Sequence, residues 1–413
     1  MYYDVAIIGG GAAGLCAAVR LKQNNPALKV AILEQLPRIG KKLITTGNGR
    51  CNITNKSIEL SRYHGEDVSF CEYALKKYTN HTAESFFKKL GIIFVYDEVG
   101  RAYPYSLQAS SVVDALRFAL EELQVDIFTE TSVTDIEKRK NLYTVKSQSL
   151  TLDCRFVILA AGLYSGGEKI GSNGSVLRLF KQKGYKTVKT TPAIVQLKTD
   201  PAAVRALKGM KVNATARLTD GKTVLREEYG EVLFCDYGLS GPPVLQLSRN
   251  AERISKRLFI SLDIMPEYTA NQLEQIIAER INDLKHRTLE EFFTGMLNKR
   301  VGQSVLKECG FSLSQSVKEL KTSDARAFAE KIKDWRFEIK GTTGFINSQV
   351  TAGGLATECF DPQTMMSKKD KNLFAIGEIL DIDGDCGGFN LQWAWSSSLL
   401  AADAICKIKE TEF

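Results

Sequence analysis

Short apolar runs alternate with helical periodicity from the start of the chain to about residue 190. Residues 5–8 are consecutive aliphatic positions, and residues 12–23 behind them have the spacing of a helix. A second apolar run at residues 29–34 and a helical pattern at residues 110–122 repeat this alternation. Strands and helices in this order are typical of an α/β layered domain.

The pattern changes between about residue 191 and residue 348. Short β-rich runs separated by turn residues suit a small barrel or sandwich, and helical periodicity follows them. Residues 335–345 then return toward strand character. The predicted strands are residues 193–198, 212–218, 222–229 and 258–264, and the predicted helices are residues 270–284, 288–298, 301–309 and 323–334.

Three glycines with GxGxxG spacing join the first apolar run to the first helix. Gly9 permits a tight turn, Gly11 lets backbone approach a pyrophosphate, and Gly14 allows close packing of helix on strand. Glu34 ends the next strand about 20 residues further on, where a carboxylate accepts hydrogen bonds from ribose hydroxyls. This order of elements predicts a dinucleotide-binding unit, and the alternative is an ordinary βαβ turn.

Further glycine-bearing segments favour a cofactor as long as FAD, which needs separate contacts for adenosine, pyrophosphate, ribityl chain and ring. The composition of residues 38–55 disfavours a helix but can present amides along a cofactor. Residues 156–162 and 372–378 predict strands that close on small residues, and Glu378 could accept from a ribityl hydroxyl. The N-terminal amides of a helix at residues 390–407 would lie against the N1 and C2 carbonyl edge of a flavin.

Gly387 and Gly388 stand directly before that last helix, and the alternative is a glycine loop that caps a core helix. Trp393 and Trp395 within it are expected to pack in the core. The residues expected to contact the cofactor are Gly9, Gly11, Ala12, Ala13, Gly14, Glu34, Gln35, Lys42, Thr46, Gly47, Asn48, Gly49, Arg50, Asn52, Val133, Ala161, Gly162, Gly377, Glu378, Gly387, Gly388, Phe389, Asn390, Leu391 and Gln392.

Four blocks of the chain carry a family resemblance: GKKLITTGNGRCNITN, GEVLFCDYGLSGPPVLQLSR, VTAGGLATECFDPQTMMSK and GEILDIDGDCGGFNLQWAWSSS. In these blocks the chain resembles the BaiN/RdsA-type family of NAD(P)/FAD-dependent oxidoreductases, also called aminoacetone-oxidase-like flavoproteins. The resemblance implies a Rossmann-like FAD domain of the two-dinucleotide-binding type, with an inserted small β-barrel and a helical subdomain. It also implies FAD as cofactor and reduction of an unsaturated substrate, such as a uridine of ribosomal RNA or a steroid-like enone.

The domain boundaries follow from the two patterns together. The FAD domain is expected in two pieces, residues 1–190 and 349–413. Between them we expect the β-barrel-like insert at residues 191–267, the helical subdomain at residues 268–334 and a return strand at residues 335–348.

Cys51 is the first candidate for the acid of the reaction. Reduction of a uracil 5,6-double bond needs a hydride at C6 and a proton at C5, and a thiol beside the ring could supply that proton. Arg50 could hold a carbonyl or phosphate oxygen and favour the thiolate after transfer. Tyr237 and Ser240 are further candidates, in a stretch expected to form a rigid exposed turn. The alternatives are a small buried hydrophobe for Cys51 and a structural turn for Tyr237.

Composition bounds the remaining possibilities. Nine cysteines without a CxxC pair disfavour a disulfide framework, and three scattered histidines make a metal site unexpected. The start of the chain lacks a signal peptide and no apolar run approaches a membrane span, so no membrane partner and a cytoplasmic location are expected. A net charge of +7, with 24 Lys and Arg against 20 Asp and Glu in residues 191–342, permits an RNA partner.

No second strand–GxGxxG–helix unit is present in the sequence. NAD(P)H is therefore expected to bind transiently over the flavin, deliver hydride to N5 and leave before the substrate enters. Three functions remain open. They are a reductase of a uridine in ribosomal RNA, a small-metabolite enone reductase or amine oxidase, and a flavin-binding protein without catalysis.

Overall fold

The computed structural model describes residues 1–252 and 256–410, and the chain divides into two compact units. The first unit holds residues 1–192 and 345–413, and the second holds residues 193–344. Each unit has its own hydrophobic core. The insertion therefore leaves the first unit after Pro192, near the expected residue 190, and the chain returns at Phe345 rather than residue 349.

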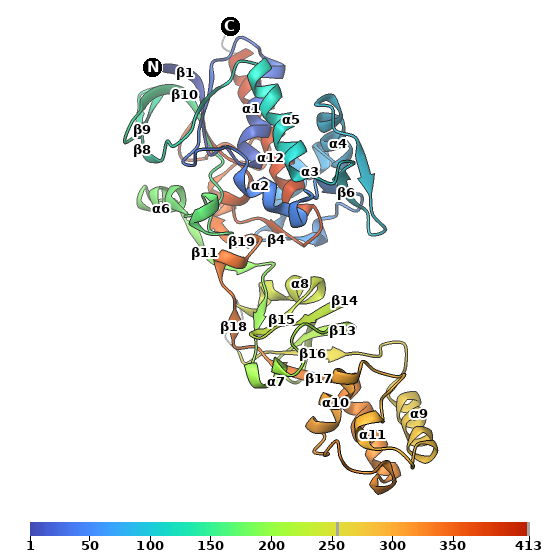
Figure 1. The fold of residues 1–413 in the computed structure, drawn as a ribbon. Helices are drawn as coiled ribbons and strands as arrows, with labels where there is room; N and C mark the ends of the chain where they lie inside the picture. The colour runs from blue at the N-terminus through green and yellow to red at the C-terminus, as the bar shows by residue number, and fades with distance from the viewer. Residues whose placement is uncertain (253–255, 411–413) are drawn as a thin grey trace. The chain divides into compact units, whose positions relative to one another are not determined.

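A seven-stranded sheet lies at the centre of the first unit (Figure 1). Its strands are β1 (Tyr2–Ile8), β2 (Val30–Leu33), β7 (Asp126–Phe128), β8 (Val133–Arg139), β9 (Leu142–Ser147), β10 (Thr151–Leu159) and β20 (Leu373–Ala375). The order is β7-β2-β1-β10-β9-β8, with β20 also paired to β10. β7, β2, β1, β10 and β20 are parallel, so their carboxyl ends share one edge, where ligands bind in sheets of this kind.

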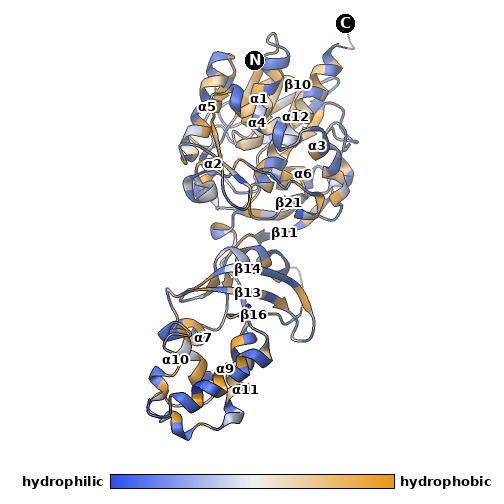
Figure 2. Cartoon of the chain, turned by 90° about the vertical axis from the view of Figure 1, so that its right-hand side faces the viewer, coloured by the Kyte–Doolittle hydropathy of each residue, from blue (hydrophilic) through white to orange (hydrophobic). Residues whose placement is uncertain are grey.

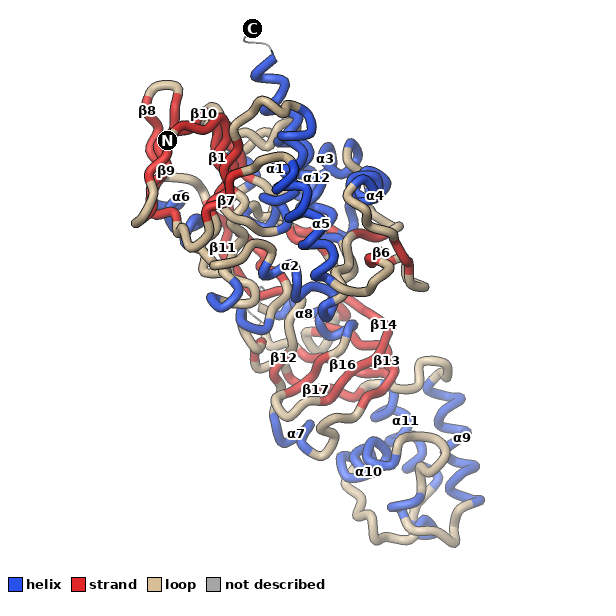
Figure 3. Tube along the Cα trace, turned by 45° about the horizontal axis from the view of Figure 1, so that its top comes forward, coloured by secondary structure: helices blue, strands red, loops and turns tan. Residues whose placement is uncertain are grey.

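Three long helices run side by side in this unit, α1 (Ala12–Asn24), α5 (Ala109–Glu122) and α12 (Phe389–Glu410) (Figures 1 and 3). Most of the side chains of α12 are buried, as its run of Trp, Leu and Ala predicts for a helix inside a core. The shorter helices are α2 (Lys41–Thr45), α3 (Glu72–Lys77), α4 (Asn80–Lys89) and α6 (Ser175–Gln182).

Three small sheets complete the first unit. A three-stranded sheet has the order β3 (Thr54–Asn55), β6 (Arg101–Pro104) and β5 (Phe94–Tyr96). The other two are the pairs β4 (Tyr63–His64) with β21 (Asp383–Gly384) and β11 (Thr187–Ala193) with β19 (Val350–Leu355). The β4–β21 pair joins a segment near the start of the chain to one near its end.

The second unit combines a seven-stranded sheet with a helical part. The strands are β12 (Leu197–Lys198), β13 (Lys211–Thr219), β14 (Val224–Phe234), β15 (Gly238–Ser240), β16 (Phe259–Asp263), β17 (Trp335–Glu338) and β18 (Gly341–Thr342). Their order is β17-β16-β13-β14-β15-β12-β18. Because only Ile339 and Lys340 separate the two edge strands, the two ends of the sheet meet, as a barrel requires.

The helices of the second unit are α7 (Pro201–Arg205), α8 (Pro242–Ala251), α9 (Ala270–Asp283), α10 (Lys299–Glu308) and α11 (Thr322–Lys333). In Figure 2 the helices α9 and α11 carry both hydrophobic and hydrophilic residues, as one-sided packing requires. Sheet and helices share one core, which includes Leu262, Phe328 and Trp335. Among the described residues, no helix combines the length and the apolarity that crossing a membrane requires.

Several expected elements are wrong. Residues 288–298 form a short 3-10 turn at Leu289–Glu291 followed by turns instead of a helix. The stretch expected to be an exposed turn contains the buried Gly238 and Leu239 of β15, and Pro242 starts α8 at a position where proline is favoured because its missing N–H has no helical partner. Residues 38–55 do contain a helix, the single-turn α2, and the strand expected at residues 193–198 is divided between β11 and β12.

Candidate functional site

The turn between β1 and α1 contains three glycines with different surroundings. A β-carbon on Gly14 would lie 2.0 Å from the carbonyl oxygen of Gly9, so only glycine lets α1 pack this closely on β1. Gly9 has a φ of +112°, and its β-carbon would lie 2.6 Å from the carbonyl oxygen of Ala160. A β-carbon on Gly11 would meet no atom of the described residues within 4 Å. Gly9 and Gly14 serve packing, and Gly11 leaves the backbone open to an approaching group.

Gly11 is also the N-cap residue of α1, and no side chain caps this helix start. The amides of Ala12 and Ala13 follow it, at the positive end of the helix dipole. Uncapped amides beside an open glycine fit the pyrophosphate of a dinucleotide.

Glu34 ties the glycine turn to the end of β2. Its Oε2 accepts a hydrogen bond from the amide of Gly10 at 2.8 Å, and its Oε1 accepts one from the amide of Leu36 at 2.9 Å. Burial raises the pKa of Glu34 above its usual range, while these backbone donors act in the opposite direction. Each carboxylate oxygen can accept a further hydrogen bond, so ribose hydroxyls fit this group.

The neighbouring Gln35 is held by a loop of the protein. Its Nε2 donates to the carbonyl oxygen of Gly171 at 2.5 Å, and its Oε1 accepts from Asn173 Nδ2 at 3.0 Å. The Gln35 side chain therefore holds the loop at residues 171–173. The backbone of Gln35 remains available for contact with a cofactor. Val133 is buried at the start of β8, just after a segment whose backbone bonds to residues 34 and 36.

The helices α1 and α12 start at the same end of the first unit. Ser398 Oγ donates to the carbonyl oxygen of Ala13 at 2.8 Å, and Arg20 makes two hydrogen bonds to Asp403, at 2.7 and 3.0 Å. Residue numbers rise together along the two helices at these contacts, so the helices are parallel. Two helix N-termini, one after Gly11 and one after Gly388, therefore lie at one end of the pair.

Glu378 follows Gly377, which packs on Ala13 of α1 and on Ala394 of α12. A β-carbon on the preceding Gly377 would lie 3.0 Å from the Cβ of Ala13. Glu378 Oε1 accepts from the amide of Thr351 at 2.9 Å, and Oε2 accepts from Lys42 Nζ at 2.5 Å. A β-carbon on Gly162 would stand 4.0 Å from Oε2. Lys42, Gly162 and Glu378 thus come from three distant segments of the chain and lie together. Such a group could bind a ribityl hydroxyl.

The loop at residues 46–52 has an unusual backbone. Gly47, Asn48, Gly49 and Cys51 all have positive φ, at 57°, 56°, 80° and 58°. Such conformations are unfavourable for Asn and Cys and cluster at ligand sites, where the surrounding structure maintains them. The carbonyl oxygen of Thr46 accepts from the amide of Cys51 at 3.0 Å and closes this loop.

Asn52 carries a buried acceptor at the end of that loop. Its Oδ1 has no hydrogen-bond partner in residues 1–252 and 256–410, and it would lie 2.8 Å from a β-carbon on Gly388. The same β-carbon would lie 2.6 Å from the carbonyl oxygen of Thr54. Gly388 is glycine because this loop packs on it, so contact with a flavin is not its primary requirement. An orphaned buried acceptor beside a helix start fits a ligand that brings an N–H group.

The polar side chains at the start of α12 bond to other parts of the protein. Asn390 Nδ2 donates to the carbonyl oxygen of Gly384 at 2.7 Å, and its Oδ1 accepts from the amide of Gly384. Gln392 is completely buried, and its amide is used by Thr54 and by other groups of the protein. The Gln392 side chain therefore already has partners within the protein, and its contact with a cofactor stays a prediction.

The start of α12 can bind a ligand through its backbone amides. The first i→i−4 hydrogen bond of the helix runs from the amide of Gln392 to the carbonyl oxygen of Gly388 at 3.0 Å. The amides of Phe389, Asn390 and Leu391 precede it and carry the positive end of the dipole. Phe389 and Leu391 themselves pack on the core.

Cys51 and Arg50 have different surroundings in the structure, and their catalytic roles stay predictions. The Cys51 side chain is 0% exposed, and burial raises the pKa of its thiol to about 12. Arg50 is exposed and its guanidinium stacks over the ring of Tyr103 at 5.0 Å. Cys51 therefore has the environment of a small buried hydrophobe.

Tyr237 lies in the second unit, and its catalytic role stays a prediction. Its phenol is half-buried, and burial together with a hydrogen bond to Cys235 raises its pKa above the usual range. The phenol is therefore neutral at physiological pH and able to donate a hydrogen bond.

A Cys51→Ser protein is expected to keep its turnover per bound cofactor, because the thiol has no access to a substrate. The buried hydroxyl is expected to lower the free energy of unfolding by about 1–3 kcal/mol. Turnover normalised to bound flavin, together with a thermal melt, checks this. A large loss of turnover at full cofactor content would restore Cys51 as the acid.

Sequence reasoning missed one polar pair near this site. His64 Nε2 lies 2.7 Å from Asp385 Oδ1, and the amide of Asp385 donates to the carbonyl oxygen of Arg62 at 2.8 Å. The side chain of Asp385 is 4% exposed and that of His64 is 22% exposed. No local sequence pattern predicts this pair, because the β4–β21 pairing is what brings the two residues together.

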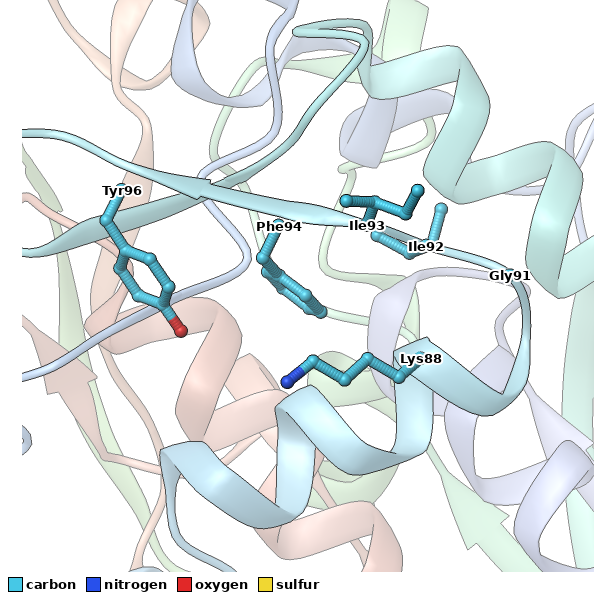
Figure 4. A pocket seen from close by; sticks show the side chains of 6 residues that line it. All are labelled: Lys88, Gly91, Ile92, Ile93, Phe94 and Tyr96. Carbon is cyan, nitrogen blue, oxygen red and sulfur yellow. The ribbon is translucent and has the colours of Figure 1, made fainter.

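One pocket of the first unit is lined by residues other than those of the site described above. It is lined by Lys88, Gly91, Ile92, Ile93, Phe94 and Tyr96 and has a volume of about 450 Å³ (Figure 4). None of these residues takes part in the contacts of the glycine turns or of Glu378.

Comparison with known proteins gives matches over nearly the whole chain. A family model described as the HI0933-like protein Rossmann domain matches residues 3–404. The 3-dehydro-bile acid delta(4,6)-reductase of Clostridium scindens is 34% identical over 403 residues, which cover 97% of this chain and 98% of that protein. The ribosomal RNA dihydrouridine synthase of Escherichia coli is 29% identical, covering 99% of each chain. That of Haemophilus influenzae is 26% identical, covering 98% of this chain and 99% of that protein.

Solved structures show the same fold at low identity. A quinol-fumarate reductase with menaquinol molecules superposes with a TM-score of 0.52 at 14% identity, covering 100% of this chain and 72% of that chain. A quinol-fumarate reductase of Escherichia coli gives a TM-score of 0.50 at 15% identity, covering 100% and 71%.

Proposed function

Because the chain belongs to the HI0933-like Rossmann-domain family and is an oxidoreductase, we propose that it uses FAD to carry hydride from NAD(P)H to an unsaturated substrate. The bond reduced is a carbon–carbon double bond conjugated with a carbonyl group, and a uridine in ribosomal RNA is the first substrate proposed. The family and the α/β Rossmann-type fold class predicted from the sequence are confirmed.

The observation that supports FAD best is that α1 and α12 start at the same end, with Glu378 following a glycine that packs on both helices. Each helix start carries the positive end of a helix dipole. A cofactor that spans both starts is therefore favoured when it places a phosphate at one and an electron-poor or anionic ring at the other. A mononucleotide would use only one of them. FAD needs separate contacts for adenosine, pyrophosphate, ribityl chain and ring, and these groups would supply them in turn.

Each end of the proposed site has its own residues. Glu34 would accept from the adenosine ribose, and the amides after Gly11 would bind the pyrophosphate. Glu378, held by Lys42, would accept from a ribityl hydroxyl. Asn52 Oδ1 would accept from an N–H of the ring, and the first amides of α12 would stabilise negative charge at the N1 and C2 carbonyl edge.

Bound FAD would supply the hydride, which the side chains of this chain cannot provide. The protein's own tasks are to position the double bond, to exclude water from it and to deliver a proton. Uracil and a steroid enone present the same problem, because in both the double bond is conjugated with a carbonyl. Hydride adds to the carbon distant from the carbonyl and a proton adds to the carbon beside it.

Uridine in ribosomal RNA has two supports. Two relatives are named ribosomal RNA dihydrouridine synthases, and the net charge of +7 suits a polyanionic partner. We expect NADPH or NADH to bleach the flavin band anaerobically and unmodified ribosomal RNA transcripts to restore it. Dihydrouridine should then be found by mass spectrometry of the digested RNA. Reduced protein that is indifferent to the transcripts, which stay unmodified, would contradict the proposal.

A small enone is the second candidate substrate, favoured by 34% identity to a bile acid reductase over 97% of this chain. Androst-4-ene-3,17-dione would then reoxidise the reduced protein. Salt separates the two candidates, because phosphate contacts make an RNA reaction weaken steeply with ionic strength while an uncharged steroid is unaffected.

A further inference from the structure

His64 and Asp385 form a pair in which the imidazole could donate a proton and the carboxylate would hold the imidazole in place. His64 Nε2 and Asp385 Oδ1 are 2.7 Å apart, and the carboxylate is almost completely buried. The imidazole keeps about a fifth of its side-chain surface exposed, so it can exchange protons with solvent. A buried carboxylate on one ring nitrogen fixes the orientation of the ring.

The charges around the pair come from two segments, residues 62–66 and residues 381–385. Arg62 directly precedes β4, and its Nη1 is 3.5 Å from Asp385 Oδ2. Asp383 lies opposite His64 in the β4–β21 register. Asp381 Oδ2, earlier in the same loop, accepts from the amide of Glu66 at 2.8 Å. Among these groups His64 carries the imidazole, a side chain that serves as a general acid in proteins.

The pair is anchored to the start of α12, which is the ring end of the proposed site. Asn390 Nδ2 donates to the carbonyl oxygens of Gly384 and Asp385, at 2.7 and 3.3 Å. The hydroxyl of Tyr63, the residue before His64, donates to the carbonyl oxygen of Phe389 at 3.1 Å. Asp385 stands two residues before Gly387, and Asn55 Nδ2 binds the carbonyl oxygen of that glycine at 2.9 Å.

We propose that His64, oriented by Asp385, delivers the proton that completes reduction of the substrate double bond. The assignment rests on the proposed function. A hydride with its electron pair adds to the carbon distant from the carbonyl, and the π pair of the double bond forms the new C–H bond with a proton from His64. Because Nε2 is bound to Asp385, Nδ1 is the nitrogen that gives the proton. The neutral imidazole then regains a proton from water, and the electrons come from NAD(P)H through the cofactor.

This assignment replaces Cys51 for a physical reason. A general acid must reach the substrate and must be reprotonated in each cycle. The Cys51 thiol has no exposed surface, whereas His64 has surface and a carboxylate partner. The competing explanation is structural, since the pair also ties β4 to the loop before α12.

Half-reactions of the whole protein separate the two explanations. In the His64→Gln and Asp385→Asn proteins we expect FAD content and anaerobic reduction by NADPH to stay within about twofold of the wild type. Reoxidation by unmodified ribosomal RNA transcripts or by androst-4-ene-3,17-dione should slow by about 100-fold for His64→Gln. A His64→Ala protein should regain part of the lost rate in the presence of imidazole, which a structural tie would not explain.

The matched control is His81→Gln. His81 is an exposed histidine on α4 that lies 3.9 Å from Glu84, and its replacement should leave both half-reactions unchanged. Reoxidation of His64→Gln at the wild-type rate, or a loss that imidazole does not restore, would overturn the role of His64 alone. Wild-type protein that NADPH reduces and neither probe reoxidises would overturn the proposed function, and the proton-donor role with it.

Discussion

The Gly14→Ala protein is expected to melt about 3–10 °C below the wild type and to purify with little FAD. The added β-carbon would lie 2.0 Å from the carbonyl oxygen of Gly9, which is backbone and cannot move aside. Overpacking of this kind costs about 1–3 kcal/mol, and each kcal/mol shifts the melting temperature of a domain this size by about 2–4 °C. Calorimetry and the flavin absorbance of the purified protein measure the two effects.

Gly11→Ala is the matched control for this change. Gly11 has an ordinary φ of −86°, and its β-carbon would meet none of the described protein atoms within 4 Å. We therefore expect the melting temperature of the cofactor-free protein to stay unchanged while the Kd for FAD rises at least about tenfold, or 1.4 kcal/mol. If Gly11→Ala bound FAD as tightly as the wild type, the pyrophosphate would lie elsewhere.

Asn52→Leu is expected to act with opposite signs on the free protein and on its complex with FAD. Leucine has nearly the same shape and removes a buried acceptor without a partner, so the cofactor-free protein should gain about 1 kcal/mol of stability. The complex should lose the hydrogen bond from the ring, which raises the Kd for FAD about tenfold. The thermal shift caused by added FAD should shrink accordingly.

Thr199→Val provides the comparison for Asn52→Leu. Thr199 Oγ1 is also buried without a hydrogen-bond partner among the described residues, and it lies in the second unit, outside the proposed site. Its replacement should stabilise the protein and leave the Kd for FAD unchanged. Equal effects of the two variants on FAD binding would mean that Asn52 Oδ1 does not face the ring.

Residues whose role depends on near neighbours in the chain were predictable. The aliphatic run of β1, the glycines behind it and the periodicity of α1 form one continuous stretch that ends at Asn24, and backbone geometry leaves them few alternatives. The long apolar helix α12 and the burial of Trp393 and Trp395 followed from composition in the same way. The helical predictions for α9, α10 and α11 were right within one or two residues at each end because their periodicity is strong.

Predictions were wrong or incomplete where packing by a distant segment decides. The stretch around Gly238 and Gly241 has the composition of a turn, but β12 and β14 flank Gly238 to Ser240 and make it a strand. The side chain of Gln392 was assigned to a ligand, and the structure adds that Thr54 and the backbone of Tyr78 use its amide. Gly388 was expected to expose helix amides to a flavin, and the structure adds that the backbone of Thr54 packs against it.

By itself, then, the sequence determined the family, the layered α/β fold and the glycine turn between β1 and α1, because each of these depends on local periodicity or on a short continuous motif. Only the tertiary structure decided that Glu378 pairs with Lys42, that Cys51 is sealed from the surface and that His64 meets Asp385. The two pairs join segments from opposite ends of the chain. The raised pKa of the Cys51 thiol follows from its complete burial. Side-chain chemistry of this kind is set by which segments pack together, and no pattern within one segment carries that information.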